Sequence, residues 1–220
     1  MSQHTEKDIL SKEIDYMNIT LMSKNIKVLV IGAGRAGFIK SKSFSQKGCE
    51  VTVVALEFCK EFQELINIKK VITNYKIDFI KDKHLIVIAV DDEKLIGEIV
   101  SNCEEENKLF LNCTDFKEGN FIVPSQSKTK NINYSINTLG GNPKTSTFLV
   151  KTMGEKLREY DNLVSFSDEL RKKIKISPYK SEILDFVASE DFNFFIKKAF
   201  HIEVLNLFYR GDNFEFKNIN

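Results

Sequence analysis

The sequence predicts an α/β protein: a Rossmann-type, doubly wound parallel sheet, followed by a small strand-containing segment and a helical C-terminal region. Three observations lead to this fold class. Short apolar, β-branched runs alternate with helical patterns as far as Asp115. A glycine-rich turn, Gly32-Ala-Gly-Arg-Ala-Gly37, follows the first of these runs. Beyond Asp115, two strand patterns occur without a helix between them, and helical periodicity then continues almost to the end of the chain.

The expected elements follow in order from the N-terminus. Residues 1–24 are polar and are expected to form an arm, with an edge segment over 16–22. Residues 28–31 are apolar and β-branched, which suits a buried parallel strand. The helical pattern over 38–46 stops at Gly48, a favourable C-terminal cap. The same reasoning predicts strands at 51–54, 71–72, 85–90 and 109–112, and helices at 58–66 and 94–105.

In the second half of the chain, strands and helices no longer alternate. Strands are expected at 121–123 and 132–136, and Pro124 limits the first because proline cannot donate to a sheet ladder. From Thr145 the pattern is helical, broken at 177–178 and 211–212. The two strands would leave an edge and an apolar face exposed in a monomer, so we expect a homodimer. The chain is therefore divided into an N-terminal arm (1–24), an NAD-binding Rossmann domain (25–118), a dimerisation segment (119–150) and a helical C-terminal region (151–220).

Composition excludes several classes of function. The 220 residues carry a formal charge of only +1, so nucleic-acid binding driven by bulk charge is not expected. The longest apolar run, over 85–90, is far shorter than the roughly 20 residues of a membrane-spanning helix. Charged residues such as Glu6, Lys7 and Asp8 stand where a secretory signal would be apolar. No membrane association and no export are expected.

The cysteines and histidines indicate a reducing compartment. The four cysteines form no C-x-x-C pair, and the three histidines are scattered at positions 4, 84 and 201. We therefore expect reduced thiols, a cytoplasmic location and no metal site.

The glycine-rich turn is the first motif that carries chemistry. It follows a predicted strand and opens a predicted helix, which is the context of a dinucleotide-binding fingerprint. Gly32 permits the tight turn, Gly34 lets the backbone approach a pyrophosphate, and Gly37 allows close packing of helix on strand. The alternative is a glycine-rich turn that binds nothing.

An acidic ribose partner is expected about 20 residues after the turn. The second strand ends in Val54-Ala55, and the nearest acid is Glu57. Glu57 either reaches the ribose or is a solvated loop charge. No arginine lies nearby to hold a 2′-phosphate, which favours NAD over NADP.

Acidic residues also follow two later strands. Asp91 and Asp92 end the central strand at the carboxyl edge, where doubly wound sheets bind ligands, but they could instead cap the next helix. Asp115 comes three residues after Asn112, at the end of the fifth strand. There it either faces the cofactor crevice, partly buried, or forms a turn.

Four sequence segments together resemble a known family. They are the 32–37 turn, Asn112-Cys-Thr-Asp115, Phe121-Ile-Val-Pro124-Ser125 and Gly140-Gly141. In this order and spacing they are similar to the siroheme synthase dehydrogenase family, the precorrin-2 dehydrogenases, over about residues 16–160. The most specific part is the Asn-x-x-Asp followed by Phe-Ile-x-Pro-Ser, because dinucleotide folds in general lack it.

The resemblance implies a function and a set of site residues. The reaction would be NAD-dependent dehydrogenation of precorrin-2 to sirohydrochlorin in siroheme biosynthesis, catalysed by a homodimer with Asp115 as the catalytic residue. The implied NAD contacts are Gly32, Gly34, Arg35, Ala36, Gly37, Leu56, Glu57, Val90 and Asp91. The expected substrate-side residues, including the nearest lysines for a polycarboxylate substrate, are Asn112, Lys117, Gly140, Gly141, Lys144 and Lys151.

The implied chemistry needs few groups, and the departures from the family pattern concern the substrate-side contacts more than the cofactor site. Dehydrogenation removes a hydride and a proton from the substrate, so a nicotinamide and one general base are sufficient. Asp115 is the candidate for that base. Some family members also insert Fe²⁺, a step that Asp115 could serve as well. The family often has Ser where this chain has Leu139, and 142–147 departs from its Ser-Pro.

The rival interpretation is a non-catalytic NAD-sensing module of the type that regulates potassium channels. Those modules also show Gly-x-Gly-Arg-x-Gly, but they usually end the second strand with an acidic residue, whereas this chain has Val54-Ala55. The 112–125 motif also argues against this interpretation.

Overall fold

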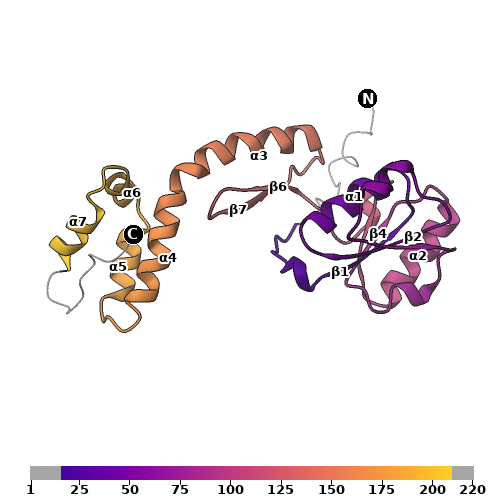
Figure 1. The fold of residues 1–220 in the computed structure, drawn as a ribbon, viewed down its shortest axis with the longest axis horizontal. Helices are drawn as coiled ribbons and strands as arrows, with labels where there is room; N and C mark the ends of the chain where they lie inside the picture. Colours follow the sequence, from indigo (N-terminus) through magenta and orange to yellow (C-terminus); the bar gives the residue numbers. More distant parts are fainter. Residues whose placement is uncertain (1–15, 210–220) are drawn as a thin grey trace, which may run out of the picture. The chain divides into compact units, whose positions relative to one another are not determined.

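The chain divides into two compact units, with the boundary between Val123 and Pro124. The structure is a computed structural model, and it describes residues 16–209 (Figure 1). The units are described separately below. The first holds the parallel sheet, and the second holds a β-hairpin and the C-terminal helices.

The N-terminal unit is a parallel sheet of five strands within the described residues, in the order β3-β2-β1-β4-β5. Its strands are β1 (Lys27–Ile31), β2 (Glu50–Ala55), β3 (Lys69–Ile72), β4 (Leu85–Ile88) and β5 (Leu109–Asn112). Val28 pairs with Val51 on one side and with Leu85 on the other. The chain therefore reverses its direction of winding between β1 and β4, which is where doubly wound sheets form a ligand crevice.

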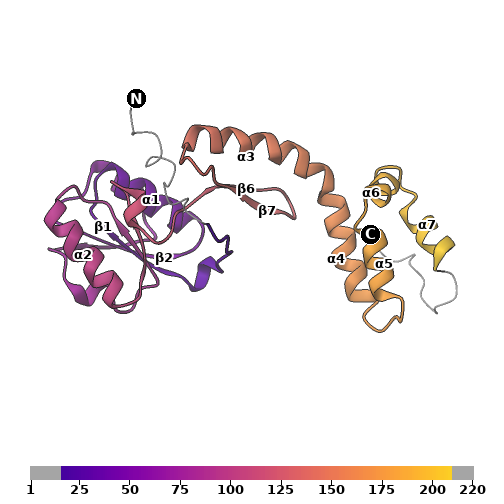
Figure 2. The ribbon, with the colours of Figure 1, turned by 180° about the vertical axis from the view of Figure 1, so that it is seen from behind.

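Helices cover both faces of this sheet (Figure 2). Side chains of β1 alternate, so that Val28 and Val30 belong to one core cluster and Leu29 and Ile31 to the other. The helix α1 (Arg35–Gln46) contributes Phe44 to the first cluster. On the opposite face, α2 (Glu93–Glu105) contributes its buried residues Ile96, Ile99 and Cys103. Burial on both faces explains why the central strands β1 and β4 are almost continuously apolar.

The prediction of an α-helix over 58–66 is wrong. The segment forms only the 3₁₀ helix η2 (Lys60–Glu64). Phe62 is buried and lies edge-on to the rings of Phe38 and Phe58. Its neighbours at 60, 61, 63 and 64 are exposed, so the segment lacks the apolar stripe that would hold a longer helix on the sheet.

The predicted edge segment and one predicted strand are also wrong. Residues 16–22 precede the 3₁₀ helix η1 (Ser23–Asn25) without strand structure, and 121–123 is not a strand. Instead, Phe121 and Val123 pack on the core of the N-terminal unit, and the Phe121 N–H donates to the Phe110 carbonyl at 3.4 Å. The first strand of the hairpin begins after Pro124. The remaining 3₁₀ helices are η3 (Ile77–Phe79), η4 (Phe116–Glu118) and η5 (Arg158–Tyr160).

The C-terminal unit begins with a hairpin, β6 (Ser125–Lys128) antiparallel to β7 (Asn133–Ile136), that packs on α3 (Pro143–Leu157). The Tyr134 hydroxyl donates to the Val150 carbonyl at 2.9 Å, and Gly154 leaves room for it. The hairpin turn is held by Asp161, whose carboxylate accepts from the Thr129 hydroxyl at 2.5 Å. It also accepts from the Asn131 N–H at 2.9 Å. These bonds, chiefly the one from Thr129, lower the pKa of Asp161.

The expected apolar open face of this hairpin is absent. Half-buried Tyr134 and Ile136 lie on the face toward α3, together with their cross-strand partners Ser127 and Ser125. Gln126, Lys128, Asn133 and Ser135 occupy the other face. The apolar surface is thus covered within the unit, and the open face of the hairpin is polar.

The remaining helices share a third core. They are α4 (Asp161–Lys173), α5 (Lys180–Val187), α6 (Glu190–Lys197) and α7 (His201–Phe208). Phe192 is fully buried between the rings of Phe166 and Phe186, at centroid distances of 5.7 and 5.3 Å. The predicted helical break at 177–178 is confirmed, and the one at 211–212 lies outside the described residues.

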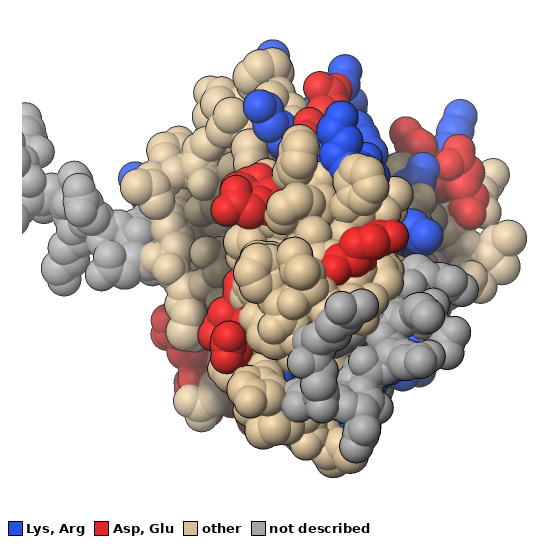
Figure 3. Space-filling model, turned by 90° about the vertical axis from the view of Figure 1, so that its left-hand side faces the viewer, with Lys and Arg blue, Asp and Glu red and all other residues tan. Residues whose placement is uncertain are grey.

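The surface fits the near-neutral composition. On the face shown in Figure 3, uncharged side chains form much of the surface, and acidic and basic groups are interspersed. Among the helices of residues 16–209, none combines the length and apolarity needed to cross a membrane.

Removing the central ring of the third core should destabilise the helical unit. Phe192→Ala should cost about 3–5 kcal/mol, because it leaves a cavity among packed rings. Phe194 lies on the same helix but is 55% exposed, so Phe194→Ala should cost about 0.5 kcal/mol or less. Urea unfolding followed by circular dichroism at 222 nm compares the two variants, and equal losses of stability would contradict this assignment of the core.

Candidate active site

Backbone hydrogen bonds hold the loops at the carboxyl edge of the sheet together. The Gly32 N–H donates to the Val54 carbonyl at 2.9 Å, and the Ala89 N–H donates to the Ile31 carbonyl at 2.8 Å. Farther along the edge, the Cys113 N–H reaches the Ile88 carbonyl at 2.9 Å. The turns that follow β1, β2, β4 and β5 are therefore set side by side.

Two glycines of the 32–37 turn are required by the packing. Gly32 has a φ of +100°, a conformation that glycine adopts without strain, and a β-carbon there would collide with the Ala89 carbonyl. A β-carbon on Gly37 would collide with the Gly32 carbonyl. The predicted roles in turn formation and in close packing thus have a direct steric basis.

Gly34 is different because open space lies in front of it. A β-carbon at Gly34 would meet no atom within 4 Å. Gly34 is the N-cap of α1, offers no side-chain cap, and is exposed together with Arg35 and Ala36. The first N–H groups of a helix lack partners within the helix and carry a partial positive charge. This space and these donors fit a dinucleotide pyrophosphate.

The loop after β2 also borders the turn. The Cys59 N–H donates to the Ala33 carbonyl at 3.0 Å, which fixes this loop against the turn. Leu56 is 62% exposed, and Glu57 is exposed beside it. Both residues are therefore free to contact a ligand at this edge.

The structure adds Glu61 to this region, which the sequence analysis did not single out. The pKa of its carboxyl group is lowered by a hydrogen bond from its own N–H, then by a bond from Cys59, and also by the positive charge of Arg35. Only folding brings this acid near the first residue of α1, so no sequence signal marked it.

Of the two aspartates after β4, Asp92 is the helix cap. Its carboxylate accepts from the Lys94 N–H at 2.9 Å and from the Leu95 N–H at 3.1 Å. The capping alternative therefore applies to Asp92. Asp91 is exposed and Val90 half-buried at the same edge.

A buried asparagine shapes the loop after β5. Asn112 is 1% exposed, its side-chain amide donates to Glu118 at 2.7 Å, and its oxygen accepts from the Thr114 N–H at 2.9 Å. The Thr114 hydroxyl donates to the Val90 carbonyl at 3.4 Å, which joins this loop to the one after β4. With both ends of its side chain occupied inside the protein, Asn112 positions the loop here.

Asp115 projects from this loop and is exposed, not partly buried as the sequence analysis expected. Its carboxylate accepts from the Lys117 N–H at 2.9 Å and caps η4. Asp115 therefore has the turn-forming role that was one of the two alternatives. A single N–H contact leaves further acceptor positions on the carboxylate. Lys117 is exposed next to it.

The other expected substrate-side residues lie in the C-terminal unit. Gly140 and Gly141 form the turn before α3, and the Gly141 N–H donates to the Thr138 carbonyl at 2.8 Å. Lys144 and Lys151 are exposed on α3, and their spacing of two helical turns places them on one face.

Leu139 and residues 142–147 depart from the family pattern, and the structure shows a helix cap in the second of these and an exposed side chain at the first. Asn142 caps α3 by accepting from the Thr145 N–H at 3.2 Å, and the Thr138 hydroxyl accepts from the Asn142 N–H at 3.0 Å. Leu139 is 80% exposed.

The cysteines and His201 are structural groups. All four cysteines lie within the described residues as free thiols, and burial raises the pKa of Cys103 to about 11. Burial lowers the pKa of His201, whose ring lies edge-on to Phe166. No group of three or more potential metal ligands occurs among residues 16–209.

Comparisons with known proteins bear on the class of cofactor. A family model described as "Putative NAD(P)-binding" matches residues 19–125. The fold, the turn and this match define the N-terminal unit as a nicotinamide dinucleotide-binding domain, which confirms the expected class of cofactor.

Several relatives carry the names of the family that the motifs resemble. The siroheme synthase of Buchnera aphidicola subsp. Acyrthosiphon pisum is 29% identical over 147 residues, which is 66% of this chain and 30% of that protein. The "Putative precorrin-2 dehydrogenase" of Methanocaldococcus jannaschii is 29% identical over 168 residues, 70% of this chain and 81% of that protein. The chain is therefore similar to proteins named siroheme synthase and precorrin-2 dehydrogenase, the family that its motifs resemble.

A solved structure shares the fold. The structure titled "SirC, precorrin-2 dehydrogenase" matches with a TM-score of 0.65 and 20% identity, covering 87% of this chain and all of that chain. The chain spans 30% to 36% of the length of several siroheme synthases that it matches.

A side chain at Gly34 should block the cofactor without disturbing the fold. Gly34→Val fills the space in front of the turn and should weaken NADH binding about 10- to 100-fold, the scale of one charge-assisted hydrogen bond. The measurement is isothermal titration calorimetry. Gly97→Val is the matched control, because Gly97 is exposed on α2 and also has open space around its β-carbon position. Parental NADH affinity in Gly34→Val would refute this placement of the cofactor.

Proposed function

We propose that this protein dehydrogenates precorrin-2 to sirohydrochlorin in siroheme biosynthesis, with NAD as the hydride acceptor. One observation carries the proposal: the exposed Asp115 carboxylate and the open space at Gly34 lie at the same carboxyl edge of one parallel sheet. The names of the relatives support this choice of substrate.

Each side of the proposed site has a defined task. The N-terminal N–H groups of α1 bind the pyrophosphate, and the absence of a β-carbon at Gly32 and Gly37 permits the close backbone contacts of the turn. When bound, NAD⁺ supplies the hydride acceptor. Asp115 accepts the proton that leaves with the hydride, so one two-electron oxidation of the substrate releases one hydride and one proton.

Asn112 is proposed to act as a positioning residue in this reaction. Its bonds to Glu118 and Thr114 order the loop that carries Asp115, and Thr114 joins that loop to the end of β4. The direction of the Asp115 carboxylate therefore depends on a buried side chain whose two ends are bonded within the protein.

NAD is proposed in preference to NADP. Glu57 is exposed after β2, where an acidic group would accept hydrogen bonds from ribose hydroxyls and repel a 2′-phosphate. On the substrate side, Lys117, Lys144 and Lys151 are exposed cations that would pair with carboxylates.

Replacing Asp115 tests the proposed base. Asp115→Asn keeps the size of the side chain and an acceptor for the Lys117 N–H but cannot take a proton. Dehydrogenation should therefore fall roughly 10²- to 10⁴-fold while NADH affinity stays near the parental value. The assay follows NADH formation with saturating NAD⁺ and precorrin-2.

Asp91→Asn is the matched control, because Asp91 is an exposed aspartate at the same edge. It should retain more activity than Asp115→Asn. Near-parental turnover by Asp115→Asn would refute the base role. A parent protein that binds NADH but does not oxidise precorrin-2 would favour the NAD-sensing alternative. The same variants, given sirohydrochlorin and Fe²⁺, report whether Asp115 also serves metal insertion.

We also propose that the protein is a cytoplasmic homodimer. The β6–β7 hairpin has an unpaired edge on each strand within the described residues. Nearby, Phe148 and Met153 of α3 are 65% and 43% exposed, and Leu139 is 80% exposed. A second copy packed on this segment would cover both features. The free thiols support a reducing compartment.

A charge at Phe148 should weaken the dimer. Light scattering at micromolar concentration should give twice the chain mass of 25.3 kDa for the parent and a lower mass for Phe148→Glu. Phe194→Glu is the control, because Phe194 is similarly exposed on α6, outside the proposed interface. A parental mass near that of one chain would contradict the dimer.

A further inference from the structure

A row of contacts joins the glycine-rich turn and the first half of α1 to the 3₁₀ helix η2. At one end of the row, the Cys59 N–H donates to the Ala33 carbonyl at 3.0 Å. Farther along, the rings of Phe62 and Phe38 meet edge-on at a centroid distance of 5.6 Å. Residue numbers rise together on the two segments, so η2 packs alongside α1 in the same direction.

Two acids of η2 follow this register beside two cations of α1. At the far end of the row, the Lys42 amine lies 3.9 Å from the Glu64 carboxylate. Glu61 and Arg35 both fall between the first two contacts of the row, Glu61 on η2 and Arg35 at the start of α1. The register therefore sets Glu61 beside Arg35, as it sets Glu64 beside Lys42.

The electrostatics of Glu61 agree with this placement. The pKa of its carboxyl group is lowered by a hydrogen bond from its own N–H, then by a bond from Cys59, and also by the positive charge of Arg35. Glu61 and Arg35 are both exposed. A ligand at the turn would therefore meet the acid and the cation together.

This pair lies on the ribose side of the cofactor site. In dinucleotide-binding folds, an acid after the second strand accepts from the ribose 2′-hydroxyl, whereas a nearby arginine holds the 2′-phosphate of NADP. Here β2 ends at Ala55, Glu57 follows it, and Glu61 comes next on the same connection. The sequence analysis expected no arginine near this connection, but the fold brings Arg35 to it.

We propose that Glu61 sets the preference for NAD over NADP by restraining Arg35. A guanidinium beside a carboxylate is partly neutralised, so it attracts a 2′-phosphate less than an unpaired guanidinium does. Because Glu61 acts through Arg35, it is a positioning residue. The inference rests on the proposed preference for NAD, to which it adds the group that restrains the only cation of the 32–37 turn.

Glu61→Gln tests this role because it removes the charge and keeps the size of the side chain. Kd values for NADH and NADPH are measured with the full chain by isothermal titration calorimetry. The ratio of the two Kd values isolates the 2′-phosphate, because both cofactors share the pyrophosphate. In Glu61→Gln this ratio should shift about 3- to 5-fold toward NADPH, the scale of one exposed ion pair. The shift should shrink as salt rises, because ions screen the phosphate.

Glu64→Gln is the matched control, because Glu64 is an exposed acid of the same 3₁₀ helix and lies beside Lys42 instead. It removes the same charge from η2 and should keep the parental ratio. Arg35→Ala, alone and combined with Glu61→Gln, completes a double-mutant cycle. Without Arg35, Glu61→Gln should shift the ratio no more than Glu64→Gln does. All variants should melt at the parental temperature because the altered side chains are exposed.

Three results would overturn the proposal. They are an unchanged ratio in Glu61→Gln, an equal shift in Glu64→Gln, and a full shift by Glu61→Gln in the absence of Arg35. Each would mean that Glu61 does not act on the 2′-phosphate through Arg35.

The parent protein tests the proposed preference separately. Tighter binding of NADPH than of NADH by the parent would refute the preference for NAD, while the cycle would still measure the coupling between Glu61 and Arg35. A parent that prefers NADH, together with an unchanged ratio in Glu61→Gln, has the opposite meaning: the preference stands and the role of Glu61 fails.

Discussion

The candidate site depends on one close approach, that of the Gly32 backbone to the Ala89 carbonyl. This contact admits no side chain and requires a φ of +100°, so the turn after β1 can lie directly against the end of β4. The helix α1 then begins at the edge of the sheet, with its free N–H groups facing outward. A larger residue at Gly32 would push the turn away from β4 and separate the anion-binding helix end from the loops that follow the neighbouring strands.

The loop that carries Asp115 is ordered in a different way, by a buried amide. Asn112 ends β5, and both ends of its side chain are hydrogen-bonded. These bonds fix the conformation of the loop from which the exposed Asp115 projects. An exposed carboxylate on a rigid loop is suited to a reaction whose difficult step is carried by the cofactor, because the protein then supplies mainly orientation and a proton acceptor. In such a reaction the surrounding surface has to exclude water once the substrate binds. A dimer partner or the substrate itself would meet that need under the proposed function.

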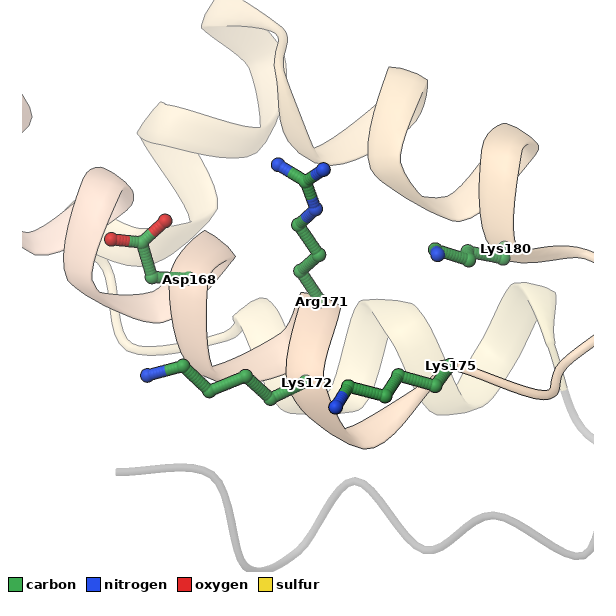
Figure 4. A pocket seen from close by; sticks show the side chains of 5 residues that line it. All are labelled: Asp168, Arg171, Lys172, Lys175 and Lys180. Atoms are coloured by element: carbon green, nitrogen blue, oxygen red, sulfur yellow. The ribbon is translucent and has the colours of Figure 1, made fainter.

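The two units present different kinds of surface for binding. The N-terminal unit offers backbone donors and carboxylates, which suit a dinucleotide and a leaving proton. The C-terminal unit offers exposed lysines on α3 and a group of basic side chains, Arg171, Lys172, Lys175 and Lys180, where α4 ends and α5 begins (Figure 4). The overall charge of +1 conceals this local separation, because acids elsewhere balance the cations. Local charge is therefore a better guide to ligands here than the net value.

Most secondary-structure elements of the N-terminal unit could be predicted from the sequence. Strands buried on both faces must be continuously apolar, and a turn that needs close backbone contact must contain glycine, so β1, β2, β4, β5 and the 32–37 turn each carry a local signal. Apolar residues misled the prediction where their partners lie far away in the sequence. Phe62 is buried without forming an α-helix, and Phe121 packs on the sheet core without forming a strand.

By itself the sequence determined the fold class, the dinucleotide-binding turn and the resemblance to a family, because these depend on local periodicity and on short motifs. Only the tertiary structure decided that Asp115 is exposed, that Asn112 is enclosed by Glu118 and Thr114, and that α3 covers the apolar side of the hairpin. It also decided that Arg171 and Lys180 line one hollow. Burial and charge clustering depend on which elements pack together, and that packing is set by contacts between residues distant in the chain.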